Sequence, residues 1–368
     1  MSRNLYKIFP HLEERLGCVV LGNYPTPVET LRTLRIKASD IWVKREDISS
    51  DIYGGNKIRT LEWLFAQAIN AGCDEICSTG SYGSNHALAT VLHAPRFGLR
   101  SSVMLHPQPY SETARKNIEI ILSNADEIRS IPHWSYLPIG LFGKRFNDRA
   151  NNRSTYIMPP GGATPTGALG YVSAAFELAL QVMSGEMPLP RRIVLPVGST
   201  CTTAGLLLGT EIASRLGFGG KWSAPPEIIA VRVTPWPITA RRRIALLSFR
   251  TSHYLHRLTG DPRALVSYAK LLERLYVDVS QFGEGYGCPT PSGLEAMEQF
   301  PHLFLDTTYS AKAAAALIQI AKNTSGCTLF WATKSSFPLP VPDQSRIEKA
   351  PLAMLRWLKD RLPMDNQY

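Results

Sequence analysis

The chain has 368 residues, and its share of 44% hydrophobic and 19% charged residues is ordinary for a globular protein. Its formal net charge is +10, but the basic residues are scattered apart from one run at 241–243, which we interpret as part of a solvated surface helix. No apolar run approaches the roughly 18 residues of a membrane span, and residues 1–16 lack the apolar core of a signal peptide. The sequence therefore predicts a cytoplasmic protein that binds neither nucleic acid nor a membrane.

The metal-binding residue types form no recognisable pattern. The eight histidines include no close pair with a carboxylate partner, so no metal is expected. The cysteines match no zinc-site spacing, and we expect reduced, mostly buried thiols. The six cysteines are Cys18, Cys73, Cys77, Cys201, Cys288 and Cys327.

Strand-like and helix-like stretches alternate along the first half of the chain. Strands are expected at 41–47, 74–80 and 100–106, and helices at 58–72, at 87–98 and from a cap at Ser111 to about Leu122. Gly72 suits the C-terminal cap of the first helix. The segment 131–155 is expected to be irregular and to be an insertion.

The second half continues the alternation, with helices through 174–183 and 202–217 and strands at 191–197 and 227–234. The segment 236–275 is basic, is expected to be helical, and is a second possible insertion. No Ser/Gly-rich linker separates domains, so any two domains must be intertwined. The alternation predicts an α/β protein with a largely parallel sheet.

A bare turn, Gly54-Gly55-Asn56, stands directly before Lys57 at the start of an expected helix. A lysine at that position faces the positive end of the helix dipole, which lowers the pKa of its ammonium group, as burial also would. A neutral lysine amine is a nucleophile that can form a Schiff base. The glycines would leave room for a flat ligand. The alternative is an ordinary surface lysine.

Two further stretches lead from an expected strand through a loop into an expected helix, at 78–90 and 197–209. Such loops direct backbone N–H groups and hydroxyls at an anion. In the first, Ser84 and Asn85 could hold a carboxylate, or could simply cap the helix. The second lacks both GK[ST] and GxGxxG but could hold one phosphate; the alternative is again a helix cap.

These loops follow one another in the order of a known family. The chain resembles the pyridoxal-phosphate enzymes of the tryptophan-synthase β-like fold (fold type II), and among them the D-cysteine desulfhydrases and 1-aminocyclopropane-1-carboxylate deaminases. The matching stretches run from about residue 21 to 338, whereas those near 131–155 and 236–275 do not match. They are LGNYPTPVETL, IWVKRED, GGNKIRTLEWL, GSNH, PPGGATPTGALGYVSAAFELA, VGSTCTTAGLLLG, YGCPTPSGLEAM, TTYSAKAAAAL and LFWATKSS.

The resemblance implies a fold and a cofactor. The fold would be two intertwined three-layer α/β/α domains with mostly parallel sheets, and the cofactor would be pyridoxal 5'-phosphate. Residues 1–58 and 173–368 would form a large cofactor-binding domain, and residues 59–172 a smaller α/β domain. The family usually forms dimers, so a homodimer is expected.

The resemblance also implies roles for the loop residues. Lys57 would be the Schiff-base lysine and Asn56 would lie at the cofactor. Asn85 would hydrogen-bond the cofactor's phenolic oxygen, and Ser84 would take the substrate carboxylate, with His86 beside it. The phosphate cradle would be Gly198, Ser199, Thr200, Cys201, Thr202 and Thr203.

Two tyrosines match the family's active-site tyrosines. Tyr309 would be an acid/base or leaving-group donor, and Tyr286 would contact the substrate. Thr333 matches the residue whose hydroxyl meets the pyridine nitrogen in the desulfhydrase branch. Ser310 stands where the deaminase branch has Glu, so either hydroxyl could meet that nitrogen.

The implied reaction is β-elimination from a small amino acid, as in D-cysteine desulfhydrase, with release of a 2-oxo acid and ammonia. Ring opening of a cyclopropane amino acid, β-replacement, and a binding or regulatory protein on an inactive scaffold are the alternatives. Four departures from the family pattern bear on the substrate, which stays open together with its enantiomer. They are Gly83, Cys201, Ala332 and Lys334.

Overall fold

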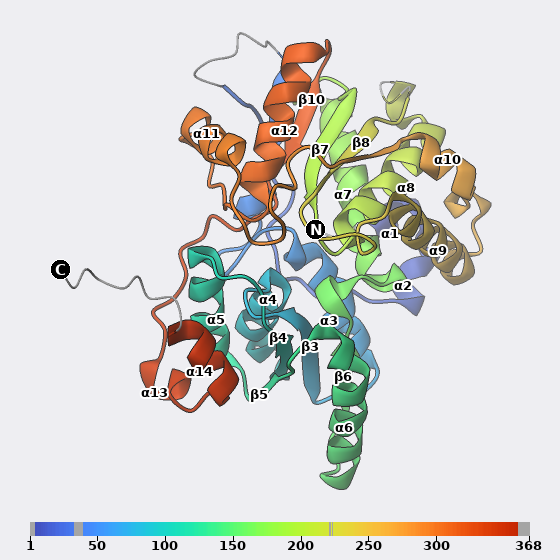
Figure 1. Ribbon diagram of the computed structural model, residues 1–368. Helices are drawn as coiled ribbons and strands as arrows, with labels where there is room; N and C mark the ends of the chain where they lie inside the picture. Colours follow the sequence, from blue (N-terminus) through green and yellow to red (C-terminus); the bar gives the residue numbers. More distant parts are fainter. Residues whose placement is uncertain (1–3, 33–39, 221, 223, 360–368) are drawn as a thin grey trace, which may run out of the picture. The chain divides into compact units, whose positions relative to one another are not determined.

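The computed structural model describes residues 4–32, 40–220, 222 and 224–359 (Figure 1). They group into two compact units, one from Met1–Ala66 with Gly162–Phe337 and one from Gln67–Gly161 with the described part of Pro338–Tyr368. This grouping sets the stretch after Phe337 with the second unit, whereas the predicted division sets it with the large domain. That division into domains stays a prediction.

The first unit is built on a six-stranded sheet in the order β1-β2-β10-β7-β8-β9. All neighbouring strands are parallel except β1 and β2, which are antiparallel. The carboxyl ends of the parallel strands therefore share one edge, where ligands of such sheets bind. The strands are β1 (Val28–Thr30), β2 (Ile41–Lys44), β7 (Arg192–Val197), β8 (Glu227–Arg232), β9 (Leu275–Asp278) and β10 (Thr328–Trp331).

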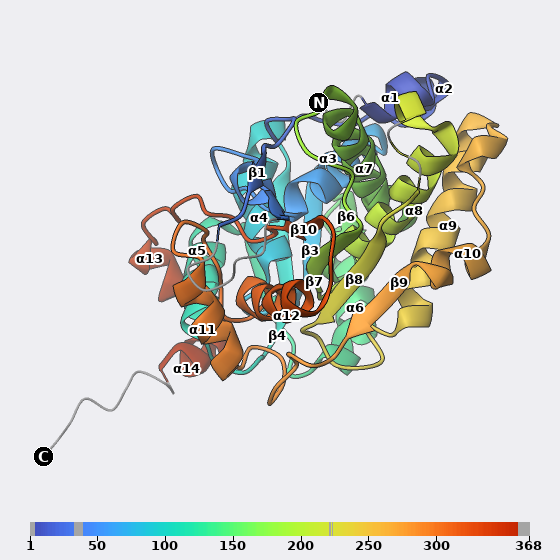
Figure 2. The same cartoon turned by 90° about the horizontal axis from the view of Figure 1, so that it is seen from above.

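Helices cover both faces of this sheet (Figure 2). In β7, Ile193 and Leu195 face the cluster formed with α7 (Pro165–Ser184) and α8 (Cys201–Leu216), whereas Val194 faces α12 (Ser310–Asn323). Because successive side chains of a strand point to opposite faces, a fully apolar strand is buried between two helical layers. The result is an α/β/α arrangement.

The first unit's other helices lie around these layers. The basic segment 236–275 is helical as predicted, and buries Ile244 and Leu255 while its arginines at 241–243 are exposed. Helix α3 begins in this unit and ends in the second. These helices are α1 (Asn4–Ile8), α2 (His11–Arg15), α3 (Lys57–Asn70), α9 (Arg241–Thr259), α10 (Tyr268–Glu273) and α11 (Pro291–Gln299).

The second unit has a four-stranded, all-parallel sheet in the order β5-β4-β3-β6. Ser111 caps its helix as predicted, since its hydroxyl accepts a hydrogen bond from the N–H of Ala114. The strands are β3 (Glu75–Ser81), β4 (Arg100–His106), β5 (Glu127–Ser130) and β6 (Thr155–Met158). The helices are α4 (Asn85–His93), α5 (Glu112–Asn124), α6 (Leu137–Ala150), α13 (Gln344–Ile347) and α14 (Leu352–Lys359).

One predicted feature of this unit is wrong. The segment 131–155 is not irregular, because it contains the 14-residue helix α6 and ends on the first residue of β6. Its periodicity is hard to recognise because α6 buries Lys144 and Asp148 and exposes Ile139, Phe142 and Phe146. A search for an inward apolar stripe therefore fails on this helix.

No described helix is long and apolar enough to cross a membrane.

Candidate active site

Lys57 is the first residue of α3, directly after the glycine turn. Gly55 has φ +83°, and a Cβ on it would lie 2.5 Å from the carbonyl oxygen of Thr333. A Cβ on Gly54 would lie 2.6 Å from the carbonyl oxygen of Asp47. Neighbouring backbone thus fills the space beside both glycines. They permit close packing of the chain at the start of α3, and do not leave the open face for a flat ligand that the sequence suggested.

The amino group of Lys57 points at the loop before α8, where Nζ donates to Ser199 Oγ at 3.0 Å. The side chain is only partly exposed, and desolvation lowers the pKa of Lys57 to about 8, with a small opposing effect of Cys201. A lowered pKa was predicted, first from the helix dipole and also from burial; in the structure burial is its main cause. A neutral, nucleophilic amine is therefore accessible near neutral pH.

The loop before α8 has the properties of an anion cradle. Thr200 takes the left-handed conformation, with φ +71°, and directly precedes the helix. The first N–H groups of a helix have no intrahelical acceptor, and the first turn of α8 contains no acidic residue. Cys201 donates to the carbonyl of Gly162 at 3.3 Å, so its thiol faces the protein interior and its backbone can still serve the cradle.

Asn56 links the glycine turn to this loop. Its side-chain Nδ2 donates to Thr202 Oγ1 at 3.0 Å, and its backbone N–H donates to the carbonyl of Thr333 at 2.9 Å. Tyr171 donates its hydroxyl to the carbonyl of Asn56 at 3.0 Å. The segments around 56, 202 and 333 are therefore held together by direct hydrogen bonds.

The two candidate tyrosines also meet. Their hydroxyl oxygens lie 2.6 Å apart. A Cβ on Gly198 would lie only 3.1 Å from the ring of Tyr309, so this ring packs against the same loop that Lys57 contacts through Ser199. Burial, and then the neighbouring Tyr286, raise the pKa of Tyr309 well above its usual value. Tyr309 is therefore a protonated phenol at neutral pH.

Two residues that the sequence did not indicate hold the tyrosines. The carboxylate of Asp306 accepts from the backbone N–H groups of Thr308, Tyr309 and Ser310 at 3.0–3.1 Å. Lys312 Nζ donates to the carbonyls of Phe282 and Gly285 at 2.8 and 3.0 Å and so anchors the loop of Tyr286. Asp306 directly precedes the TTYSAK stretch and Lys312 is its last residue, but neither was expected from the sequence to have a function.

The two candidates for the pyridine nitrogen have different surroundings. Ser310 Oγ donates to Asp306 Oδ1 at 2.7 Å and accepts from the Asp306 N–H at 2.7 Å. Thr333 follows β10 and is buried, with 6% of its surface exposed. Next to it, Lys334 donates to the hydroxyl of Tyr53 at 3.1 Å.

A buried ion network lies behind the start of α3. Arg59, two residues after Lys57, donates to Glu46 at 2.6 Å and to Glu177 at 2.9 Å. Lys44 donates to Glu177 at 2.7 Å. All four side chains are at most 2% exposed. The sequence feature that could have indicated this network is Glu177, a charged residue in the otherwise uncharged helix α7.

The remaining candidates, Ser84, Asn85 and His86, lie in the second unit at the start of α4. Ser84 Oγ accepts from the N–H of Ala87 at 3.2 Å and caps the helix. Asn85 Oδ1 accepts from Asn117 Nδ2 at 2.8 Å, and the same amide donates to the carbonyl of Gly83 at 2.8 Å. His86 is buried. Asn117, on α5, is a further site residue that the sequence did not indicate.

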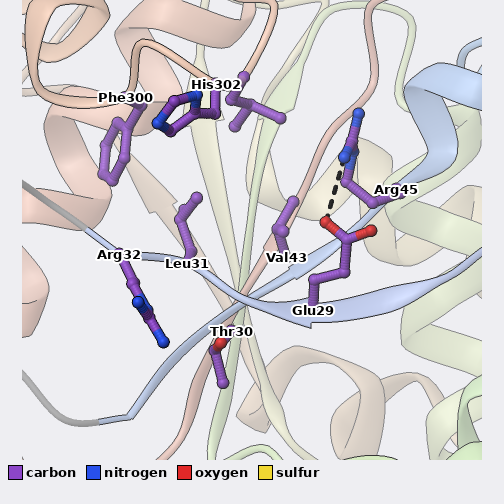
Figure 3. Close-up of a pocket in the computed structure, with 9 residues that line it drawn as sticks. Glu29, Thr30, Leu31, Arg32, Val43, Arg45, Phe300 and His302 are labelled. Carbon is purple, nitrogen blue, oxygen red and sulfur yellow. Dashed lines mark hydrogen bonds and ion pairs between the residues drawn. The ribbon is translucent and has the colours of Figure 1, made fainter.

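A cavity of about 180 Å³ in the first unit involves none of these residues (Figure 3). Arg45 points across its wall and bonds Glu29 at 3.1 Å. Its lining comes from Glu29, Thr30, Leu31, Arg32, Val43, Arg45, Phe300, His302 and Leu303.

Comparison with known proteins identifies the family of this chain. Residues 19–329 match the family described as pyridoxal-phosphate dependent enzyme. The chain belongs to this family. The family and cofactor predicted from the sequence are thereby confirmed, and so is the α/β fold class with mostly parallel sheets.

Individual relatives of this pyridoxal-phosphate-dependent enzyme cover most of its length. It is 30% identical to a D-cysteine desulfhydrase of Salmonella paratyphi C, over 84% of the chain and 88% of the relative. It is 27% identical to nocardicin C-9' epimerase of Nocardia uniformis, over 84% and 89%. The crystal structure of an ACC deaminase homologue superposes with a TM-score of 0.70 at 25% identity, over 91% of this chain and 95% of that one.

The described residues of the first unit fit pyridoxal phosphate. The cofactor has an aldehyde that reacts with a neutral amine and a phosphate that needs N–H and O–H donors. The enzyme presents a lysine of pKa about 8 whose Nζ is 3.0 Å from a serine of a hydroxyl-rich helix start. The amine suits the aldehyde of the cofactor, and the adjoining helix start suits its phosphate.

Proposed function

We propose that this enzyme eliminates a leaving group from the β-carbon of a small amino acid and releases a 2-oxo acid and ammonia, as a D-cysteine desulfhydrase does. The similarity to D-cysteine desulfhydrase of Salmonella paratyphi C supports this class of reaction. The observation that carries it is the position of Tyr309. The ring of Tyr309 packs on the loop before α8, which Lys57 contacts through Ser199. The hydroxyl of Tyr309 is protonated.

We assign the cofactor to the residues that the sequence predicted for it. Lys57 would hold it through Nζ, with Asn56 alongside, and Asn85 would hydrogen-bond its ring oxygen. Its phosphate would lie at the start of α8, on Gly198, Ser199, Thr200, Cys201, Thr202 and Thr203. When bound, pyridoxal phosphate withdraws electrons from the bonds at the α-carbon of an amino acid.

The protein supplies the proton transfers. Lys57 Nζ, once neutral, accepts the proton that leaves the α-carbon. Tyr309 Oη donates its proton to the atom that departs from the β-carbon, and Tyr286 Oη, 2.6 Å away, can return a proton to it. Ser84 and His86 would bind the substrate, with its carboxylate on Ser84. Each of these proton transfers therefore has a defined donor or acceptor atom on the protein.

We propose that the hydroxyl of Thr333 is the hydrogen-bond partner of the cofactor's pyridine nitrogen. The alternative, Ser310, has its hydroxyl engaged by both the carboxylate and the N–H of Asp306, which supports Thr333. A hydroxyl partner there would leave the nitrogen of bound cofactor neutral, which would favour prompt elimination over transamination.

A substrate screen tests the proposed reaction. Purified enzyme with cofactor is incubated with D- and L-cysteine, β-chloroalanine, serine and 1-aminocyclopropane-1-carboxylate, and 2-oxo acid and ammonia are measured. Pyruvate from cysteine without an added nucleophile is the expected result. Absence of 2-oxo acid from every β-substituted amino acid would overturn the proposal, and product formation only with an added nucleophile would indicate β-replacement instead.

Ring opening of 1-aminocyclopropane-1-carboxylate is a second candidate, supported by the likeness to an ACC deaminase homologue. It yields 2-oxobutyrate, which chromatography separates from pyruvate. Borohydride treatment of the yellow enzyme, followed by peptide mass spectrometry, tests the assignment of Lys57 under either reaction. Label on any other lysine contradicts it.

We further propose a cytoplasmic homodimer. None of the six cysteines, all of which lie among the described residues, forms a disulfide, which supports a reducing compartment.

A further inference from the structure

Arg232 is the last residue of β8 and lies at the carboxyl edge of the six-stranded sheet. In the parallel pairing of β7 with β8 it stands beside Val197, the residue directly before the loop at 198–200. Val197 packs in the cluster formed with α7 and α8. Side-by-side residues of two strands point to the same face of the sheet, so the side chain of Arg232 is directed to the face that α8 covers.

The alternation along β8 gives the same direction. Ile228 and Ala230 pack in the cluster with α7 and α8, whereas Val231 packs in the cluster with α12. Successive residues of a strand point to opposite faces, so Arg232 points with Ile228 and Ala230. An arginine thus stands at the edge of the sheet where α8 begins.

The guanidinium group of Arg232 is poorly satisfied by the protein itself. Nη2 donates to the carbonyl of Thr239 at 3.5 Å, which is long for a hydrogen bond. Nε is buried and has no hydrogen-bond partner among the described residues. These residues also give Arg232 no ion-pair partner. A buried charged donor without an acceptor is costly, and it indicates a group that the chain alone does not provide.

The starts of two helices add positive charge near Arg232. Thr239, whose carbonyl the guanidinium reaches, directly precedes Ala240, the N-cap of α9. Neither Ala240 nor Thr200, the N-cap of α8, makes a side-chain cap hydrogen bond, and neither helix has an acidic residue in its first turn. The amino end of a helix carries a partial positive charge. A cation beside these ends is therefore unfavourable unless an anion binds there.

Holding the turn at Thr239 does not account for this arginine. Thr239 is already held by its own hydroxyl, which donates to the carbonyl of Thr234 at 2.8 Å. The long bond from Nη2 adds little to that contact and leaves Nε without a partner. The arrangement therefore fits a binding residue better than a structural one.

We propose that the guanidinium group of Arg232 binds the phosphate of pyridoxal phosphate. The loop 198–203 provides hydroxyls and backbone N–H groups but contains no lysine or arginine. Arg232 would supply the positive charge that a phosphate dianion favours, through charge-assisted hydrogen bonds. The inference rests on the position proposed above for the phosphate, at the start of α8, and is independent of the reaction.

Titration of the cofactor-free enzyme tests the contact with two ligands that differ only in the phosphate. Pyridoxal 5'-phosphate and pyridoxal are each added, and the absorbance of the Schiff base gives both dissociation constants. Arg232→Gln should weaken binding of the phosphorylated ligand at least about ten-fold and leave that of pyridoxal unchanged. Arg192→Gln is the matched control and should change neither constant, because Arg192 lies at the opposite end of β7 and pairs with Glu227 at 3.3 Å.

A second variant separates the function of Arg232 from the position of the phosphate. Ser199→Ala removes a hydroxyl of the loop and should also reduce the preference for pyridoxal 5'-phosphate over pyridoxal. A reduced preference in Ser199→Ala with an unchanged one in Arg232→Gln would overturn the proposal for Arg232 and keep the phosphate at α8. An unchanged preference in both variants would overturn both. Release of pyruvate from cysteine tests the reaction separately, because these constants do not depend on it.

Chemical modification of the wild type gives a test that needs no variant. Arg232 is partly exposed, so phenylglyoxal should modify it in the cofactor-free enzyme, as measured by peptide mass spectrometry. Saturating inorganic phosphate should slow this modification at least about ten-fold, because only the unoccupied fraction reacts. The rate at Arg192 should stay the same. Absence of reaction at Arg232, or an equal rate with and without phosphate, would overturn the proposal even if Arg232→Gln does not fold.

Discussion

The hydroxyl oxygens of Tyr286 and Tyr309 lie 2.6 Å apart, and the ring of Tyr309 packs against Gly198. Lys312 anchors one tyrosine through the 282–285 loop, and the Asp306 carboxylate anchors the other through its backbone N–H. The pair is thus held by contacts of its own before any substrate binds. Preorganisation of this kind suits proton donation.

Substitution of Tyr309 should show whether it protonates the leaving group. A positioned general acid contributes about 10²–10⁴ in rate, so Tyr309→Phe should lower kcat for cysteine by that order while the absorbance of the bound cofactor is retained. Chloride leaves without protonation, so the loss should shrink with β-chloroalanine. Equal losses for both substrates would contradict the role. Tyr286→Phe, which keeps the donor itself, should lose less.

The pKa of Lys57 predicts a pH-dependent reactivity. Burial lowers this pKa from 10.5 to about 8, so the neutral amine becomes the major form as pH rises through about 8. Competitive acetylation of cofactor-free enzyme, read by peptide mass spectrometry, should give a Lys57 labelling midpoint near pH 8. A lysine model peptide in the same tube should titrate near its usual value of about 10.4. A Lys57 midpoint at that higher value would show that burial does not lower the pKa of Lys57.

The glycine turn should tolerate no side chain at Gly55. Gly55→Ala combines a φ of +83° with a Cβ 2.5 Å from a backbone oxygen, and should lower the free energy of unfolding by more than about 3 kcal/mol. Gly72→Ala has a similar φ, +66°, but open space around its Cβ, and should cost only about 1 kcal/mol. Denaturant unfolding measures both. Equal costs would mean that backbone contact at Gly55 is unimportant.

The sequence predicted those parts of the site that have a local signature. Lys57 after two glycines and the hydroxyl-rich start of α8 are each contiguous, and the helix-start physics that marks them acts within one turn. Asp306 accepts from N–H groups only two to four residues further on, a local pattern that a search for helix-capping residues could have found. Asn117 and Lys312 escaped prediction because their partners lie on other elements or loops, where only the fold brings them into contact. The same reason explains α6, whose charged residues meet their partners on β3 and β5.

Asn117 should matter through Asn85. Removing its amide deprives Asn85 Oδ1 and the Gly83 carbonyl of a donor, so Asn117→Ala should weaken cofactor binding about ten-fold. Asn124→Ala, on the same helix, loses only a bond to the carbonyl of Ile120 and should leave cofactor affinity unchanged. Titration of the cofactor-free variants by absorbance measures both. Equal cofactor affinities of the two variants would show that Asn117 does not contribute to cofactor binding.

Glu177 should make the first unit acid-sensitive. Burial alone would raise the pKa of Glu177, but Arg59 and Lys44 outweigh it and lower the pKa from 4.5 to about 2. A lowered carboxylate pKa means that the unfolded chain binds the proton first, so the stabilisation is present above about 4.5 and is lost as pH falls toward 2. The amount at stake is on the order of 3 kcal/mol. Glu177→Gln should abolish this part of the pH dependence.

At neutral pH the same variant leaves two buried cations without their shared carboxylate, so it should also lose about 3–5 kcal/mol of unfolding free energy. The matched control is Glu227→Gln. Glu227 pairs with Arg192 at 3.3 Å but is 37% exposed, so its loss should cost at most about 1 kcal/mol. Denaturant unfolding at several pH values between 7 and 3 compares the variants with the wild type. Parallel curves for wild type and Glu177→Gln would show that Glu177 keeps an ordinary pKa, in spite of its burial between Arg59 and Lys44.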